Sequence, residues 1–240
     1  MIVLFTDFGK CGPYVGQLHL RLAQLAPDQR VIDLQHDAPA FDPRASAYLL
    51  AALLQSVPDG AIVVAVVDPG VGTARLPVLL ETERHRLIGP DNGLLAITAR
   101  HAQSASWRRI DWSDDSISAT FHGRDLFAPA AAQLVRGETL DTSELPQPPV
   151  GHDWPADLAE VIYIDDYGNA WTGQRCAADA VPTEVRARGA RFAATRTFGD
   201  APRHTPVCYR NSSGLLELAV TQDRADERCG LQIGTPVQIR

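Results

Sequence analysis

An acid and a base lie close together in the stretch VDPGVGTAR at positions 67–75, where Asp68 follows an apolar run and Arg75 comes seven residues later. The proline between them fixes one φ angle, and the two glycines permit tight or left-handed turns. The chain can therefore reverse around Asp68 so that Arg75 faces it. The spacing alone leaves two interpretations open, namely a surface ion pair of no chemical interest and part of a catalytic site.

A histidine can join this pair. His122 stands in the stretch TFHGRD, directly ahead of a predicted helix for which Asp125 can serve as the N-cap. A lone loop histidine is more often structural than catalytic. In an open α/β sheet, however, the loops at the carboxyl ends of the strands gather at one edge. An acid, an arginine and a histidine gathered there would be able to handle a proton.

Two further acids follow strand-like segments, Asp7 in TDFG and Asp91 in GPDNG. A carboxylate such as Asp7 can accept hydrogen bonds from the two vicinal hydroxyls of a ribose, although an aspartate at a strand end often only caps a turn. The glycine patterns of pyrophosphate-binding loops are missing. The acids and His122 could also ligate a metal, but they lack a ligand spacing such as H-E-x-x-H, so we expect no metal at this site.

Two polar loops stand out in the second half of the chain. The stretch DDYGNAW begins at Asp165 and includes Asn169, whose amide can both donate and accept hydrogen bonds along the edge of an adenine. The stretch NSSG includes Ser212 and Ser213, whose hydroxyls could receive a carboxylate. Plain turns explain both stretches equally well.

The elements that must position these residues divide the chain into two parts. Apolar spacing predicts strands at 2–6, 30–35 and 61–67 that alternate with helices at 14–25 and 41–56. Short strands at 77–82, 86–88 and 107–112 follow, together with helices at 94–101 and 125–136. This order predicts an α/β domain over residues 1–145, with a mostly parallel sheet flanked by helices.

The composition changes between positions 141 and 155, which hold four prolines and no apolar period. We therefore place a linker at 146–157. Beyond it, short strand-like runs without long helices, at 160–164, 184–187, 215–220 and 236–239 among others, predict a small antiparallel β domain over 158–240. A ligand held where two such domains meet is the expectation.

The overall composition bounds the function. A net charge of −7 without any basic run excludes the electrostatic footprint of a nucleic-acid binder, so a small-molecule substrate is expected. The four cysteines are far apart, which is typical of reduced thiols. There is neither a secretion signal nor a run of about 20 apolar residues for a membrane helix. We expect a cytoplasmic protein that does not bind a membrane.

The motifs together resemble one family. TDFG, PYVG, VDPGVG, GPDNG, TFHGRD, DYGN and SSGLLELAV follow one another in the order seen in the S-adenosyl-L-methionine (SAM) hydroxide adenosyltransferases, the hydrolase relatives of the fluorinase and chlorinase. Each motif is weak, but the ordered set covers essentially the whole chain. The resemblance implies hydrolysis of SAM to adenosine and L-methionine, with SAM as the substrate and no cofactor, and the R-sulfonium epimer is a candidate form of that substrate.

The resemblance also assigns roles to residues. It implies that Asp68, Arg75 and His122 are catalytic, and that the substrate is held by a second set of side chains. Asp7 would hold the ribose, Asn169 the adenine edge, Phe41 and Phe121 the adenosine, and Asp165, Ser212 and Ser213 the methionine end. It further implies a homotrimer or a dimer of trimers with active sites between subunits.

This chain departs from the family pattern at Gly12, where relatives usually have an acid that binds the amino group of the substrate. A non-catalytic protein that binds adenosine or SAM is therefore an alternative, and a metal-dependent phosphoesterase is a third. A halide is the less suitable nucleophile because the carboxylate of Asp68 would repel it. Water held by Asp68 and Arg75, with His122 as proton acceptor or relay, is the mechanism that these residues predict.

Overall fold

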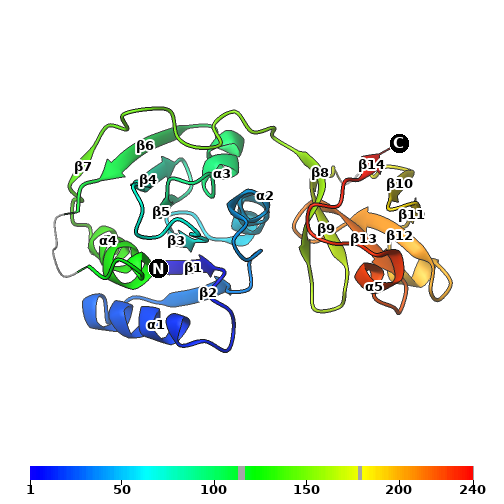
Figure 1. Ribbon diagram of the computed structural model, residues 1–240, viewed down its shortest axis with the longest axis horizontal. Helices are drawn as coiled ribbons and strands as arrows, with labels where there is room; N and C mark the ends of the chain where they lie inside the picture. The colour runs from blue at the N-terminus through cyan, green and yellow to red at the C-terminus, as the bar shows by residue number, and fades with distance from the viewer. Residues whose placement is uncertain (113–116, 178–179, 240) are drawn as a thin grey trace. The chain divides into compact units, whose positions relative to one another are not determined.

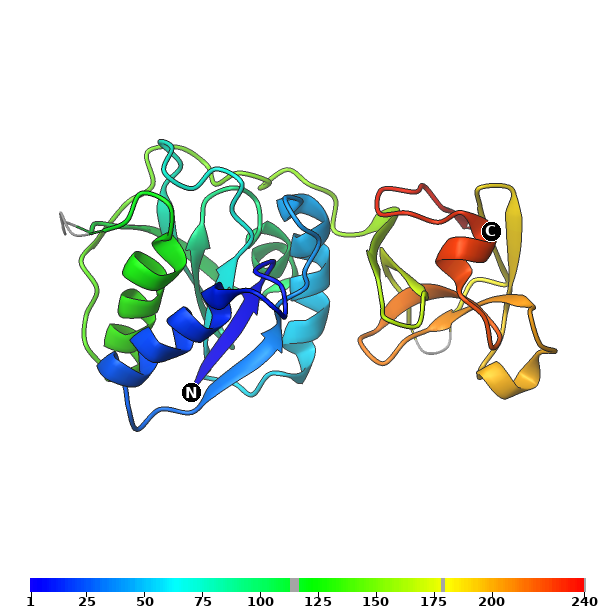
Figure 2. The ribbon, with the colours of Figure 1, turned by 60° about the horizontal axis from the view of Figure 1, so that its bottom comes forward.

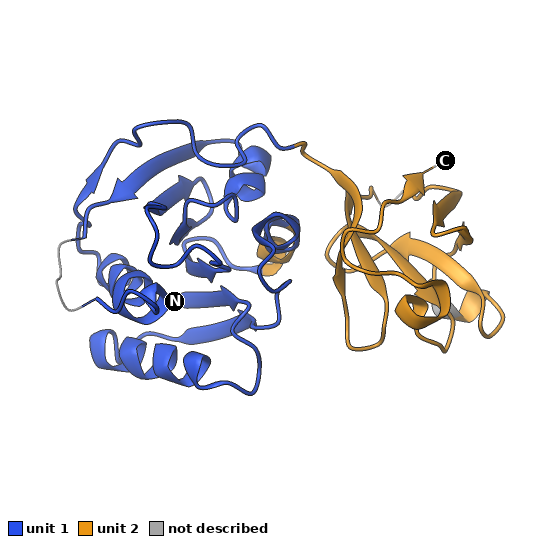
Figure 3. Cartoon of the chain, viewed as in Figure 1, with its two compact units in different colours: residues 1–51, 57–154 blue, residues 52–56, 155–240 orange. Residues whose placement is uncertain are grey.

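A computed structural model describes residues 1–112, 117–177 and 180–239 of the chain. These residues form two compact units, shown in blue and orange in Figure 3. Unit 1 comprises residues 1–51 and 57–154, and unit 2 comprises residues 52–56 and 155–240. Among the described residues, no helix combines the length and the apolar character needed to cross a membrane.

The sheet of unit 1 has seven strands in the order β2-β1-β3-β5-β4-β6-β7 (Figure 1). The strands are β1 (Ile2–Thr6), β2 (Val31–Gln35), β3 (Ile62–Val66), β4 (Pro77–Thr82), β5 (Arg86–Pro90), β6 (Ala105–Ile110) and β7 (Thr142–Ser143). The first four strands in this order pair in parallel, as the alternation of strands and helices predicts. The other three pairings are antiparallel.

The predicted mostly parallel sheet is therefore wrong, because the sheet is mixed. The cause is the connection between β4 and β5, which is only the three residues 83–85. A parallel pair needs a crossover of a dozen or more residues, whereas a short loop makes its two strands antiparallel neighbours. The sequence places these two strands close together, but the direction of β6 beside β4 depends on tertiary pairing.

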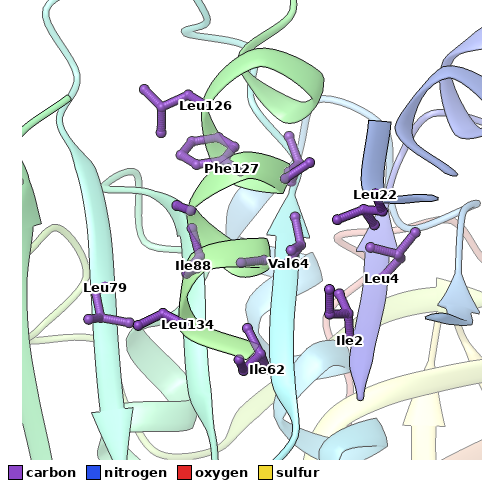
Figure 4. Packing of buried hydrophobic residues seen from close by; sticks show 14 of the residues in the cluster. Ile2, Leu4, Leu22, Ile62, Val64, Leu79, Ile88, Leu126, Phe127 and Leu134 are labelled. Carbon is purple, nitrogen blue, oxygen red and sulfur yellow. The ribbon is translucent and has the colours of Figure 1, made fainter. Parts of the chain in front are cut away.

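Two helices, α1 (Pro13–Leu25) and α4 (Ala128–Val135), cover one face of this sheet, and α2 (Pro43–Leu53) lies on the other side (Figure 2). Alternate residues of β3 supply both faces. Ile62, Val64 and Val66 pack under α1 and α4 together with Leu4 and Phe127 (Figure 4). The intervening β3 residues are equally buried, which explains the uninterrupted β-branched run.

The helix predicted over 125–136 is divided in two. Residues Gly123–Phe127 form a π-helical turn, and the α-helix begins only at Ala128. Pro129 lacks the N–H that would donate to the preceding turn, so the regular hydrogen-bond ladder cannot run through this point. The wider turn carries His122 at its N-terminal end. The predicted helix at 94–101 is shortened to α3 (Ala96–His101).

The sheet of unit 2 also has seven strands, in the order β14-β10-β11-β12-β13-β9-β8. They are β8 (Leu158–Ile164), β9 (Ala170–Arg175), β10 (Glu184–Ala187), β11 (Ala190–Ala194), β12 (Pro206–Arg210), β13 (Leu215–Val220) and β14 (Gln238–Ile239). An antiparallel bridge between Glu160 and Pro236 nearly closes the sheet into a barrel. The strand β12 and the short helix α5 (Ala225–Cys229) are absent from the sequence prediction.

The predicted antiparallel sheet of unit 2 is wrong at one pairing, because β11 and β12 are parallel. The connection between them spans residues 195–205 and contains a short 3-10 turn, which lets the chain return to the starting end before the next strand. The remaining pairings in this sheet are antiparallel.

The proline-rich segment after β7 is bound to unit 1 along much of its length. The Val150 N–H donates to a carboxylate oxygen of Asp91 at 2.9 Å, and Arg100 donates to the His152 carbonyl at 2.7 Å. The Trp154 ring lies so close to Gly93 that an added Cβ would approach it to 2.2 Å. These contacts hold the segment in place up to the end of unit 1.

Candidate active site

The turn after β3 is built from two consecutive reversals. The Val71 N–H donates to the Asp68 carbonyl at 3.2 Å, and the Thr73 N–H donates to the Gly70 carbonyl at 3.1 Å. Gly72 has a φ of +78°, and a Cβ at this position would lie 2.6 Å from the Ala119 carbonyl oxygen. Both the left-handed backbone and the close approach therefore require glycine here. The reversals return Arg75 to the strand end from which Asp68 projects.

Arg75 and Asp68 form a buried ion pair. The Arg75 Nε lies 2.9 and 3.1 Å from the two carboxylate oxygens, and Nη2 also donates to Oδ2. The Arg75 side chain is 9% exposed and the Asp68 side chain 4% exposed. A buried pair of this kind is strongly coupled, because removing one partner leaves the other charge buried and unpaired. The structure thus contradicts the interpretation as a surface pair.

His122 completes a continuous chain of hydrogen bonds, since Arg75 Nη2 lies 2.7 Å from its Nδ1. A guanidinium can only donate, so Nδ1 must accept and carries no proton. The ring is then neutral, with its proton on Nε2. Burial lowers the pKa of His122, and the positive charge of Arg75 lowers it further. The pKa shift and the hydrogen bond therefore favour the same neutral form.

Two further contacts fix Arg75 and the backbone next to Asp68. The Arg75 guanidinium carbon lies 5.2 Å from the centre of the buried Phe127 ring, within the range of a cation–π interaction. Asn92 donates to the Val67 carbonyl at 2.8 Å and so anchors the strand end next to Asp68. The GPDNG motif contains Asn92, but sequence reasoning assigned it no part in the site.

The charged chain lies beside a hollow of about 260 Å³ in unit 1. This volume is just below the roughly 300–1,000 Å³ of pockets that enclose whole small molecules. Predicted site residues from four separate loops meet here. The lining includes Asp7, Phe41, Asp68, Phe121 and His122.

Asp7 and Phe41 lie together at this hollow. The Phe41 N–H donates to Asp7 Oδ2 at 3.2 Å. Burial raises the pKa of Asp7, and the Phe41 N–H opposes that rise. Phe41 adopts a φ of +58°, which is rare for a residue with a side chain, and 78% of it is exposed. A strained backbone that presents an exposed aromatic ring at a pocket is typical of a binding position.

Two aromatic residues of the hollow were not among the predicted site residues, Phe8 and Tyr14. Their rings pack edge-on against Phe121, with centroids 5.6 and 5.3 Å from it. The sequence signal was available, because Phe8 belongs to TDFG and Tyr14 to PYVG. The three rings give the hollow an apolar part of its lining beside the acids.

Two other acids singled out in the sequence do not line this hollow. Asp91 accepts the Val150 N–H and serves to fix the proline-rich segment. Burial raises the pKa of Asp91, against the effect of that hydrogen bond. Asp125 is paired with Arg124 and accepts the Ser118 N–H at 3.2 Å. Among the described residues, the one group with metal-ligand spacing lies elsewhere, on α1 and β2 and the residue after β2.

In unit 2, Asp165 closes the turn between β8 and β9. Its Oδ1 accepts the N–H groups of Tyr167 at 3.0 Å and Asn169 at 2.9 Å, and its Oδ2 accepts from the Asn169 side-chain amide at 3.1 Å. Asn169 also lines a hollow of about 500 Å³ with Tyr167 and Arg224. The amide of Asn169 is thus held in one orientation, with its oxygen directed away from Asp165.

Ser212 and Ser213 lie on the turn between β12 and β13, outside the hollow that Asn169 lines. The buried Asn211 shapes this turn, because its side-chain oxygen accepts the N–H groups of Ser213 and Leu215 at 3.0 and 2.9 Å. Asn211 belongs to NSSG but is not among the predicted site residues. An asparagine whose side-chain oxygen accepts the N–H of the residue two positions later is the usual signal for such a turn.

A family comparison covers both units. Residues 2–144 match the SAM hydroxide adenosyltransferase N-terminal domain, and residues 159–238 match the corresponding C-terminal domain. The chain is 38% identical to an (R)-S-adenosyl-L-methionine hydrolase from Thermus thermophilus, over 99% of this chain and 98% of that protein. It is also 38% identical to one from Salinispora arenicola, over 98% and 95%.

Two solved structures have the same fold. An uncharacterized conserved protein from Thermotoga maritima superposes with a TM-score of 0.83 at 28% identity, covering 99% of this chain and 98% of that one. A conserved hypothetical protein from Thermus thermophilus superposes with a TM-score of 0.76 at 36% identity, covering 100% and 99%.

Proposed function

The chain belongs to the SAM hydroxide adenosyltransferase family, as the motif order predicted, and on this premise we propose that it hydrolyses (R)-S-adenosyl-L-methionine to adenosine and L-methionine. The observation that carries the proposal is the hydrogen-bonded chain Asp68–Arg75–His122 beside the hollow of unit 1. Each of these three side chains can form hydrogen bonds that position a water molecule. The N-terminal domain alone contains all three.

The substrate explains what this site has to supply. The leaving group of a sulfonium is a neutral thioether, which departs without a general acid and without a Lewis acid. The demanding step is the attack of water on C5′ in line with the departing sulfur. Orientation of that water and stabilisation of the charge that develops on it are therefore the main contributions of the protein. We propose that no metal or other cofactor takes part.

The hydrogen-bond directions assign separate tasks to the three side chains. Arg75 donates to both partners, which fixes its guanidinium and leaves His122 with a proton on Nε2. In this form His122 donates to the water rather than accepting from it. Asp68 retains carboxylate lone pairs that can accept the proton of the attacking water. We therefore assign the proton acceptor to Asp68 and the orienting donor to His122.

The remaining predicted residues are assigned to the substrate. Asp7 holds the ribose hydroxyls, while Phe41 and Phe121 contact the adenosine. In unit 2, Asn169 reads the adenine edge, and the turns that carry Asp165, Ser212 and Ser213 receive the methionine end. We propose that the protein forms a homotrimer, or a dimer of trimers, with sites between subunits. Light scattering of the purified chain tests that assembly.

The proposal is tested by incubating the protein with each sulfonium epimer in oxygen-18 water, with and without a chelator. Hydrolysis at C5′ places the label in the 5′-hydroxyl of adenosine and leaves methionine unlabelled. We expect turnover of the R epimer that the chelator does not change. Binding without turnover would instead indicate a non-catalytic SAM-binding protein, and activity lost to the chelator would indicate a metal-dependent enzyme.

Variants of the same chain separate binding from chemistry. We expect Asp68→Asn to lose adenosine release while SAM still binds in equilibrium dialysis. Asp91→Asn is the matched control, because that acid also follows a strand but does not line the hollow. Equal activity in Asp68→Asn and the wild type would refute the assigned role.

A further inference from the structure

Two histidines and an aspartate converge in unit 1, outside the residues that line the hollow of the candidate active site. His19 lies on α1, Asp33 on the edge strand β2, and His36 directly after that strand. The Nε2 atoms of His19 and His36 lie 2.7 and 3.0 Å from the same atom, Asp33 Oδ1. One ligand atom from each of the three residues falls within 4.8 Å of the others.

The buried member of this cluster has a poorly aligned ring nitrogen. His36 is 8% exposed, and its Nε2 makes no aligned hydrogen bond despite its short distance to Asp33. The other ring nitrogen, Nδ1, lies 2.7 Å from the Thr6 hydroxyl. A buried ring nitrogen whose one polar neighbour, Asp33 Oδ1, lies out of line with it is poorly satisfied, which is costly. In metal-binding histidines the ring nitrogen that does not bind the metal typically forms a hydrogen bond, as Nδ1 of His36 does with Thr6. That hydrogen bond fixes the tautomer and the orientation of the ring.

We propose that His19, Asp33 and His36 form a binding site for a divalent transition-metal cation of the Zn²⁺ type. Imidazole nitrogens and a carboxylate oxygen are ligands that such ions accept, and they hold Zn²⁺ at about 2.0–2.2 Å. Neighbouring ligands around a tetrahedral ion are then about 3.3–3.6 Å apart, so the observed spacings of 2.7 and 3.0 Å to Asp33 Oδ1 need to widen only slightly. Hard cations such as Mg²⁺ prefer oxygen ligands and do not fit this set.

The positions of the ligands indicate what the ion would do. His19 and Asp33 are 37% and 45% exposed, so an ion can enter from solvent and keep a water ligand. It would connect α1 to the edge strand β2. The His36 carbonyl also accepts the Gly9 N–H at 2.6 Å, so the ion would stiffen the loop that follows β1 and carries Asp7. The site is therefore structural and distinct from the Asp68–Arg75–His122 chain.

The test is a calorimetric titration of the full chain, freed of metal by a chelator, with ZnCl₂. We expect one equivalent to bind to the wild type, and binding at least tenfold weaker for His19→Ala, because a direct ligand should matter at least as much as an outer-shell partner. Thermal unfolding gives an independent readout, since an ion that binds only the folded state raises Tm. That increase should be present in the wild type and absent in His19→Ala.

A matched control uses the other unit. His204 forms a similar pair with Asp223 at 3.1 Å, but without a second histidine, so His204→Ala should bind Zn²⁺ as the wild type does. Asp33→Asn tests the carboxylate without a change of shape and should also weaken binding. The proposal is overturned if the wild type binds no stoichiometric Zn²⁺, if His19→Ala binds equally well, or if Mg²⁺ competes at equal concentration.

Discussion

The turn after β3 in unit 1 and the turn after β8 in unit 2 use an aspartate at a strand end in different ways. Asp68 is paired with a buried arginine that in turn contacts His122. Asp165 is satisfied by backbone N–H groups and by the Asn169 amide. The first arrangement concentrates charge and a titratable ring at one point, whereas the second fixes neutral donors and acceptors. Unit 1 is thus suited to chemistry and unit 2 to recognition.

A second acidic side chain in unit 2, Glu217, is also bound by a neutral partner. Glu217 is 4% exposed and accepts a hydrogen bond from the Tyr209 hydroxyl. Burial raises the pKa of Glu217, and burial also raises the pKa of Tyr209. Both shifts favour the protonated, uncharged form of each group. The Tyr209–Glu217 pair therefore differs from the ion pair that unit 1 places beside its hollow.

Replacing Arg75, the positively charged member of the Asp68–Arg75–His122 hydrogen-bonded chain, should have the largest effect. We expect Arg75→Ala to lower kcat by on the order of 10²–10³-fold, because Asp68 and His122 lose the side chain that holds both of them toward the water. Stability should fall by about 3–5 kcal/mol, because Asp68 remains as an unpaired buried charge. Steady-state kinetics and urea unfolding measure the two effects. The control is Arg84→Ala, which breaks an exposed pair with Asp59 and should cost less than about 1 kcal/mol.

A smaller effect is expected from distorting the turn without removing a charge. In Gly72→Ala the added Cβ meets the Ala119 carbonyl oxygen at 2.6 Å, on a backbone with positive φ. We expect a loss of roughly 1–3 kcal/mol in stability and about a tenfold loss in kcat as Arg75 is displaced.

The matched control is Gly137→Ala, which has a similar φ of +80° but no atom within 4 Å of the added Cβ. It should show the backbone strain alone, with kcat unchanged. If both variants lose the same activity, the close approach at Gly72 has no part in positioning the site.

A substitution in the turn after β8 of unit 2 should weaken substrate binding rather than slow the chemical step. In Asp165→Asn one carboxylate oxygen becomes an amide that must face either backbone N–H donors or the Asn169 amide, and donors then oppose donors. We expect KM to rise by about tenfold, which corresponds to ~1.4 kcal/mol, with kcat nearly unchanged. A loss of kcat with KM unchanged would contradict the division between chemistry and recognition.

The smallest effect should come from pH. Because its folded-state pKa lies below the ordinary value of about 6.5, His122 stays neutral in the folded protein at pH values where the unfolded chain already binds a proton. Its contribution to stability is complete above about pH 6.5 and is lost as pH falls below that value.

Protonation of Nδ1 would also break the contact with Arg75, so the acid limb of kcat/KM should lie below pH 6.5. pH-dependent unfolding and kinetics of the wild type and His122→Gln measure both. An unchanged acid limb in the variant would assign the limb to another group.

Much of unit 1 could be predicted from local patterns. The strand at 2–6, the helix near α1 and the buried run of β3 each follow from apolar spacing that one element satisfies by itself. Unit 2 was harder at two of its elements. β12 and α5 carry weak periodicity and gain their stability from neighbours in the sheet, so no local signal separated them from loops.

The sequence by itself determined the residue types, their order and the family, because seven motifs in fixed order cannot arise from composition alone. It also placed two glycines at the turn after Asp68, but only the structure shows that position 72 requires one. Only the tertiary structure decided that Arg75 is buried, that it faces His122 across 47 positions of sequence, and that Asp91 serves elsewhere. Burial and hydrogen-bond direction depend on which strands become neighbours, and pairing between distant segments leaves no local trace in the chain.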